Sequence, residues 1–245
     1  TLFGLTNWQV VVGGAVVLFL LGEAAMMVWR RINTVELIEP EVTTTPFMAP
    51  LRVAFHHVMY LPGLKRLVIL TAAINLVFGA TLATSAAMVT GLFDLPGNYY
   101  ALLQTLGALA TVAVLLIIAA TNMGIGRIGA IGYVMVIVGG IITAFSPNYW
   151  VYALGFVLIL GFDGMYAVYI RTARQRIIPA RDLGKTTGVV ILFNNLSLPL
   201  SGLIVGLAAS PAQTGWVILG LSALMIVAGL AVTVGIWARK PVATA

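Results

Sequence analysis

The stretch Arg171–Lys185 reads "RTARQRIIPARDLGK" and holds five of the thirteen Lys and Arg residues of the 245-residue chain. Charged residues make up 8% of the chain and apolar residues 61%, whereas a soluble globular protein is about 25% charged and about 45–50% apolar. The sequence therefore has the composition of a membrane protein, in which clustered basic residues mark segments that stay outside the bilayer.

Seven apolar runs are bounded by charged residues, Gly, Pro or Asn. Their lengths match the ~20 residues with which a helix crosses the ~30 Å hydrocarbon core of a bilayer. The turn sequences "DLPGN", "SPN" and "SPAQTG" separate three pairs of them. The sequence thus predicts an all-α membrane protein with seven transmembrane helices, at Trp8–Trp29, Leu67–Val89, Tyr99–Ala120, Ile128–Phe145, Tyr149–Ile170, Thr186–Ala209 and Trp216–Ala238.

All thirteen Lys and Arg residues fall in alternate connections between these spans or after the last one. The positive-inside rule makes this side cytoplasmic, so Arg171–Lys185 is predicted to be the major cytoplasmic loop. The C-terminus is then inside the cell and the N-terminus outside. An outside N-terminus without a signal peptide is easier to explain if further spans precede it.

The connection 32–66 is much longer than the others and contains "PLRVAFHHVMYLPG". This pattern predicts a short amphipathic helix on the membrane surface, and we interpret His56 and His57 as interfacial residues of the linker. The lipid-facing residues are predicted to be Leu51, Phe55, Val58 and Met59. The long linker divides the chain into a single helix at 1–31, a cytoplasmic linker at 32–66 and a bundle of six helices at 67–240.

This arrangement resembles the C-terminal half of a major facilitator superfamily transporter, in which two six-helix halves are joined by a cytoplasmic loop and bind substrate between them. The resemblance implies that the first span is the family's sixth helix, which closes an absent N-terminal bundle, and that the other six are its seventh to twelfth. In "PARDLGKTTG", Pro179, Gly184 and Gly188 match the spacing P-x4-G-x3-G that links the family's tenth and eleventh helices. This linker looks most like the bacterial exporters grouped with the enterobactin exporter and macrolide-efflux proteins.

A second motif lies between the third and fourth spans. In "GIGRIG", Arg127 and Gly129 resemble the end of the family's loop motif D-R-x-G-R. The resemblance implies a gating loop at these two residues. Gly126 stands where the family has an acid and Ala130 where it has the final basic residue, so the charge pair of that motif is missing here.

Asp163 is the first candidate for carrying transport. It lies eight residues before Arg171, about 12 Å along a helix, which places it near the bilayer midplane. Acids in a membrane cost roughly 2.5–3.5 kcal/mol on insertion scales and point to function. A carboxyl beside aromatic rings such as Tyr166 in a dehydrated cavity has the chemistry of a proton-coupled antiporter. The alternative is a structural acid that bonds to a neighbouring helix or reaches the interface.

Polar residues in three other spans are further candidates for binding substrate or protons. Glu23 lies about 10 Å inside Arg30 and is expected to pair with Asp163, with the absent half or within its own helix layer. Asn194 and Asn195 precede Pro199, which frees backbone groups near a bend. These asparagines, and Asn75 in the second span, either bind a polar substrate or form hydrogen bonds between helices.

The function predicted from these observations is secondary transport of a small organic molecule, such as a siderophore or drug, by proton-coupled export and alternating access. The expected partners are the substrate, protons, the lipid of a bacterial inner membrane and the N-terminal half, and not nucleic acid. A seven-helix receptor or a non-transporting structural subunit is the alternative. No cysteine, HExxH or GxSxG motif is present, so we predict no enzyme, metal site or cofactor.

Overall fold

The computed structural model describes residues 8–32, 48–207 and 210–237. All regular elements in these ranges are helical, and seven helical segments are long and apolar enough to cross a membrane. This confirms the prediction of an all-helical chain with seven such helices. The chain divides into two compact units, residues 1–45 and residues 46–245.

The first unit contains one described helix, α2 (Trp8–Ile32), of 25 residues. It is about 37 Å long at 1.5 Å per residue, which is sufficient to span a bilayer. Arg30 and Arg31 lie in its last turn, where cations stabilise the exposed carbonyl groups of a helix end. The only acid of α2 is Glu23.

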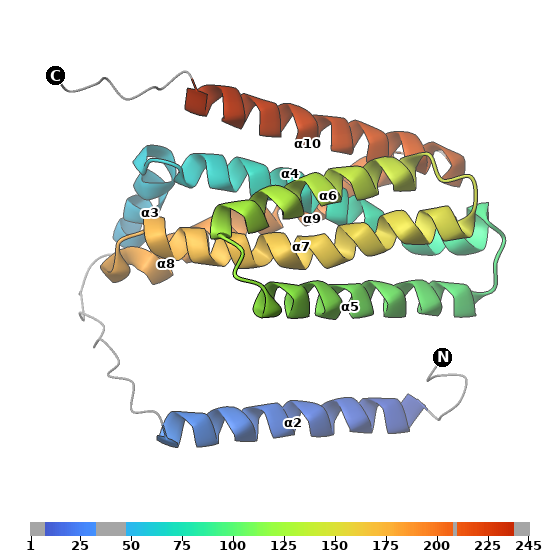
Figure 1. Cartoon of the computed structure of the whole chain (residues 1–245), viewed down its shortest axis with the longest axis horizontal. Coiled ribbons are helices and arrows are strands. Elements are labelled where there is room, and N and C mark those ends of the chain that lie inside the picture. Colours follow the sequence, from blue (N-terminus) through green and yellow to red (C-terminus); the bar gives the residue numbers. More distant parts are fainter. Residues whose placement is uncertain (1–7, 33–47, 208–209, 238–245) are drawn as a thin grey trace. The chain divides into compact units, whose positions relative to one another are not determined.

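The second unit is a bundle of six spans with one additional helix at its end (Figure 1). The spans are α4 with its π-helical continuation η1, then α5, α6, α7, the pair α8–α9, and α10. In chain order the elements are α3 (Met48–Tyr60), α4 (Leu64–Ala87), η1 (Met88–Leu92), α5 (Gly97–Ala120), α6 (Ile125–Ala144), α7 (Tyr149–Ile177), η2 (Ala180–Asp182), α8 (Leu183–Asn195), α9 (Ser197–Gly206), η3 (Pro211–Gln213) and α10 (Thr214–Trp237).

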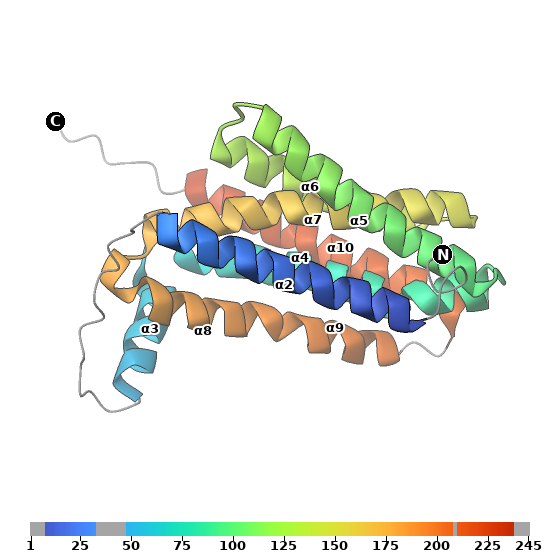
Figure 2. The same cartoon turned by 90° about the horizontal axis from the view of Figure 1, so that it is seen from below.

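Consecutive spans run in opposite directions (Figures 1 and 2). The connections 61–63, 121–124 and 178–182 therefore lie at the same end of the bundle as the last turn of α10. We call this the basic end, because it gathers the described Lys and Arg residues of the second unit, namely Arg52, Lys65, Arg66, Arg127, Arg171, Arg174, Arg176, Arg181 and Lys185.

The basic stretch Arg171–Lys185 differs from its prediction, because most of it is helical rather than a loop. α7 continues to Ile177, and residues 178–182 separate it from α8. At 29 residues, α7 is about 43 Å long, which exceeds the ~30 Å of hydrocarbon. The first arginine thus marks where the helix leaves the apolar region rather than where it ends. Pro179 follows the helix end, since it cannot continue the backbone ladder.

The sixth predicted span is divided at Leu196 into α8 and α9. Pro199 has no N–H group, so the carbonyl of Asn195 lacks its usual partner four residues on. The interruption of the helix therefore lies just before Pro199, as the sequence predicted. The predicted end of this span at 208–209 is outside the described residues.

Glycines allow α6 to lie directly against α7. A Cβ atom added at Gly139 would lie 2.8 Å from the carbonyl oxygen of Gly155, and one at Gly155 would lie 2.7 Å from that of Gly139. A Cβ at Gly132 would lie 3.0 Å from the backbone nitrogen of Tyr166. The two backbones touch without intervening side chains, which is how small residues bring spanning helices together. α7 thereby takes a central position, with α5 packed on it as well.

Candidate functional site

A cavity of about 280 Å³ lies between α4, α7 and α8. We call it the polar cavity, because it collects polar and charged side chains from three spans. Five residues predicted from the sequence line it: Asn75, Asp163, Tyr166, Asn194 and Asn195. The sequence identified each of them as a polar or aromatic residue within an apolar run but did not predict that all five lie together.

The part of the polar cavity that contains Asn75, Asp163 and Asn194 lies at mid-depth in the bundle. Asn75 is eleven residues from the start of α4, and Asn194 is eleven residues from the start of α8, which places both about 16 Å from the basic end. Asp163 is the central residue of α7, with fourteen residues on either side. The three side chains thus lie at similar depths, near the middle of α4, of α7 and of the α8–α9 span.

One hydrogen bond crosses the cavity wall beside the break in the α8–α9 span. The Asn75 side-chain amide Nδ2 donates to the backbone carbonyl oxygen of Asn194 at 2.9 Å. The side chain of Asn194 is buried, and its Oδ1 has no hydrogen-bond partner among the described residues. The Asn75 side chain therefore binds the backbone of α8, while the Asn194 side-chain oxygen has no hydrogen-bond donor among the described residues.

Asp163 faces the polar cavity without a protein partner. Within the described ranges no hydrogen bond or ion pair reaches its carboxylate. The predicted aromatic face along α7 is only partly present at this site. Tyr166 and Ile170 line the cavity with Asp163, whereas Tyr152 and Phe156 belong to a separate cluster that includes residues of α5 and η1.

Two further residues line the cavity, Arg171 and Arg174, although the charge pattern predicts a loop there. They are one turn apart on α7, and the Nε atom of Arg174 is buried with no hydrogen-bond partner among the described residues. Their spacing from Asp163 in the sequence could have indicated that they belong to the same site. Positions 163, 167, 170 and 174 follow a helical repeat and fall on one face once the helix extends beyond residue 170.

The remaining predicted residues lie elsewhere. Glu23 belongs to α2 in the first unit, and its expected pairing with Asp163 stays a prediction. Arg127 and Gly129 lie in the first turns of α6 and not in a loop. A Cβ at Gly129 would lie 2.6 Å from the Tyr169 ring, so close packing requires this glycine. Its role in gating stays a prediction.

A second cavity, of about 420 Å³, lies among α4, α6, α7 and α10. Its lining is almost wholly apolar and aromatic, with Tyr133, Tyr166 and Tyr169 among the larger side chains. Tyr133 already donates its hydroxyl to the carbonyl of Met225 at 2.6 Å. This cavity offers no charged group, so the polar cavity is the better candidate for a site that recognises a ligand.

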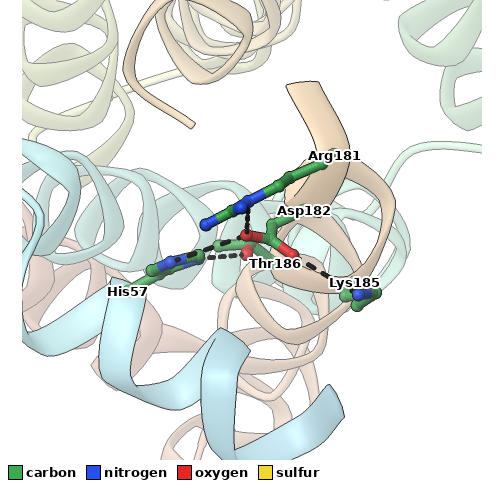
Figure 3. Close-up of polar contacts among 5 residues, drawn as sticks. All are labelled: His57, Arg181, Asp182, Lys185 and Thr186. Atoms are coloured by element: carbon green, nitrogen blue, oxygen red, sulfur yellow. Dashed lines mark hydrogen bonds and ion pairs between the residues drawn. The ribbon is translucent and has the colours of Figure 1, made fainter. Parts of the chain in front are cut away.

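Polar contacts also gather around Asp182 at the basic end, where Figure 3 shows five side chains. The Asp182 carboxylate lies 3.3 Å from Lys185 Nζ, 3.4 Å from Arg181 Nε and 3.9 Å from His57 Nε2. The other ring nitrogen of His57 forms a hydrogen bond with Thr186 Oγ1 at 3.0 Å. We call these five residues the Asp182 cluster. It joins α3 to the beginning of α8.

These contacts change the interpretation of α3. The predicted helix is present, and Leu51, Phe55 and Met59 are exposed as expected of lipid-facing residues. Val58, however, is only 6% exposed and belongs to the core of the second unit. His57 binds α8 instead of lying free at the interface. The helix is therefore docked on the bundle by one face.

A scan against models of protein families found no match for the chain, and searches of curated proteins and of solved structures found none either. We therefore base the proposed function on the residues of the polar cavity and on the pattern of the spans.

Proposed function

We propose that the chain is part of a secondary transporter of the major facilitator type, which exports a small organic molecule in exchange for protons. In this proposal α4 to α10 form one of two bundles, and the bundles rock to expose a site between them alternately. The basic end faces the cytoplasm of a bacterial cell, in agreement with the positive-inside rule, and the C-terminus lies on that side.

The observation that carries the proposal is an unpaired carboxylate in a mid-depth cavity. Asp163 lies at the centre of a spanning helix, and the other polar residues of the cavity come from three different spans. An ionisable group inside a membrane is costly and marks proton or substrate pathways. The proton-carrying role belongs to Asp163, while Asn194 and Asn195 contact the substrate.

A second bundle would pack against the α8–α9 span. Its surface carries two glycine pairs with the spacing that lets spanning helices approach closely, Gly184 with Gly188 and Gly202 with Gly206. A Cβ at any of these four positions would meet no atom within 4 Å, so packing among the described residues does not require them. The two-bundle architecture predicts that the complete reading frame encodes five more spans before α2.

Compound-dependent proton movement tests this function. Inverted membrane vesicles that contain the product of the complete gene would be given an acidic interior, which a pH-sensitive dye reports. A panel of cationic dyes, neutral drugs and organic acids would then be added. We expect at least one compound to dissipate the gradient about tenfold faster than in vesicles without the protein, a change of about 1.4 kcal/mol in barrier height.

The Asp163→Asn variant provides the residue-level test. It should insert normally and lose the compound-dependent proton movement, because an amide cannot carry a proton at this position. Asp182→Asn is the matched control, since it removes the same charge outside the polar cavity. Wild-type proton movement in the Asp163→Asn vesicles, or no response to any compound in wild-type vesicles, would contradict the proposal.

A further inference from the structure

We propose that the polar cavity binds an organic acid, with its carboxylate or phosphate held by Arg171 and Arg174 and a hydroxyl or amino group donating to Asn194. This inference names the substrate class of the transport site and rests on the function proposed above. The structure assigns it through three features: the pairing of the arginines, the unused groups on the cavity wall and the size of the cavity.

The two arginines carry positive charge that no acid of the described chain neutralises. All three ion pairs found among the described residues involve Asp182. Arg171 and Arg174 are one turn apart, where like charges destabilise a helix, and both line the polar cavity. A buried donor without a partner, such as Arg174 Nε, carries a further cost. An anion bound between the two guanidinium groups would relieve both penalties.

The chemistry of the guanidinium group identifies the anion. Its planar fork of N–H donors matches the paired oxygens of a carboxylate or phosphate, and such charge-assisted bonds are about twice as strong as neutral ones. Asp163 lies eight residues from Arg171, a separation of about 12 Å along the helix. It is therefore too distant to supply this anion itself.

Asn194, on the α8 side of the cavity, indicates a second functional group on the bound acid. Asn194 Oδ1 is a buried acceptor with no partner among the described residues, and Asn75 already uses its amide nitrogen on the backbone. The ligand must therefore bring a donor, such as a hydroxyl or an amine. At about 280 Å³ the cavity is near the lower limit of the ~300–1,000 Å³ of small-molecule sites, so it suits a small acid and not a two-chain lipid.

Binding of matched probes tests this inference separately from transport. The purified chain in detergent would be titrated calorimetrically with 4-hydroxybenzoate, 4-aminobenzoate and glycerol 3-phosphate, and with the neutral analogue 4-hydroxybenzamide. We expect saturable binding of at least one acid, and affinity for 4-hydroxybenzamide at least about tenfold weaker than for 4-hydroxybenzoate, since each lost charge-assisted bond is worth about 1.5–3 kcal/mol. Equal binding of this acid and its amide, or no acid bound at all, would overturn the proposal without any variant.

Arg174→Gln locates the site, with Arg176→Gln as the matched control. Both remove one charge from the end of α7, but Arg176 is exposed and does not line the cavity. Acid affinity should fall by about tenfold or more for Arg174→Gln only. The same titration in nanodiscs with and without phosphatidylglycerol identifies the source of the anion. Equal acid affinity in both supports a free acid, whereas competition by phosphatidylglycerol would overturn the small-acid assignment in favour of a lipid headgroup.

The two proposals fail in different ways. Selective acid binding combined with unaltered proton movement in Asp163→Asn would remove the transport mechanism and leave the anion site in place. Proton movement that depends on Asp163 but responds only to cationic or neutral compounds would support the transport mechanism and remove the proposed anion site.

Discussion

Asp163 and Asp182 lie on consecutive helical elements of one bundle, yet the surroundings of their carboxylates differ completely. Asp182 has His57, Arg181 and Lys185 within 3.9 Å. Asp163 has no ion-pair partner in the described chain and faces a cavity at mid-depth. A carboxylate that pairs with neighbouring basic side chains serves the structure. One without partners remains available to protons or to a ligand.

The contrast follows from where each acid lies along the bundle. At the basic end, the long Lys185 and Arg181 side chains reach water while they pair with the buried Asp182, so the cations keep much of their hydration. Asp163 has two arginines on its own helix face, but they lie about two and three helical turns away towards the basic end. The separation keeps the carboxylate and the guanidinium groups as distinct features of one cavity.

The largest expected effect comes from substitutions that remove each carboxylate entirely. Asp163→Leu should lower the rate of compound-dependent proton movement by at least about tenfold. The thermal unfolding temperature of this variant should be unchanged or higher. Asp182→Leu should keep proton movement and lower the unfolding temperature, because its cationic partners lose their counter-charge. Vesicle proton assays and thermal unfolding of the same preparations measure both. Equal losses of proton movement in the two variants would contradict the different roles assigned to Asp163 and Asp182.

The next effect concerns the cavity wall. Asn75→Ala removes the donor to the Asn194 carbonyl and should lower the free energy of unfolding by about 1–3 kcal/mol, the cost of an unsatisfied buried group. Gln104→Ala on α5 is the control, because the Gln104 side chain makes no hydrogen bond within the described residues. Denaturant unfolding followed by tryptophan fluorescence compares them. Indistinguishable midpoints would show that the hydrogen bond contributes nothing to stability.

A smaller effect is expected for the docking of α3. Asp182→Asn weakens the contacts that join α3 to α8 and should raise amide exchange in residues 48–60, with a local loss of about 1–2 kcal/mol. Arg181→Gln is the matched control at the same carboxylate, since the Arg181 side chain is 87% exposed. Hydrogen exchange with mass spectrometry resolves this peptide. Unaltered protection of α3 in Asp182→Asn would mean that apolar contacts alone dock the helix.

The smallest effect separates two adjacent histidines. His57→Ala removes the hydrogen bond to Thr186 and should cost about 1 kcal/mol. His56→Ala should stay within about 0.5 kcal/mol, because His56 is exposed and only stacks on Tyr60 at 4.4 Å. Thermal unfolding of the two variants is a direct comparison. A larger shift for His56→Ala would contradict the assigned roles.

The sequence was sufficient to predict the spans and much of the cavity, because both depend on composition along the chain. Asn75, Asp163 and Asn194 are identifiable as polar residues inside apolar runs, and Pro199 correctly indicates where the helix is interrupted. The charge pattern does not reveal the role of Arg174, because charged residues usually mark the end of a spanning helix, whereas α7 extends past the hydrocarbon. The pairing of His57 with Thr186 was also missed, since these residues are 129 positions apart. No local pattern encodes such a contact.

Reaction with a lipid-soluble carbodiimide tests the difference between the two aspartates most directly. The reagent modifies protonated carboxyl groups that it can reach from the bilayer, and mass spectrometry identifies the labelled peptide. We expect adducts on Asp163, absent in Asp163→Asn, and none on Asp182, which pairs with Arg181 and Lys185. Labelling of Asp182 while Asp163 stays unmodified would contradict the assignment of Asp163 as the group that exchanges protons.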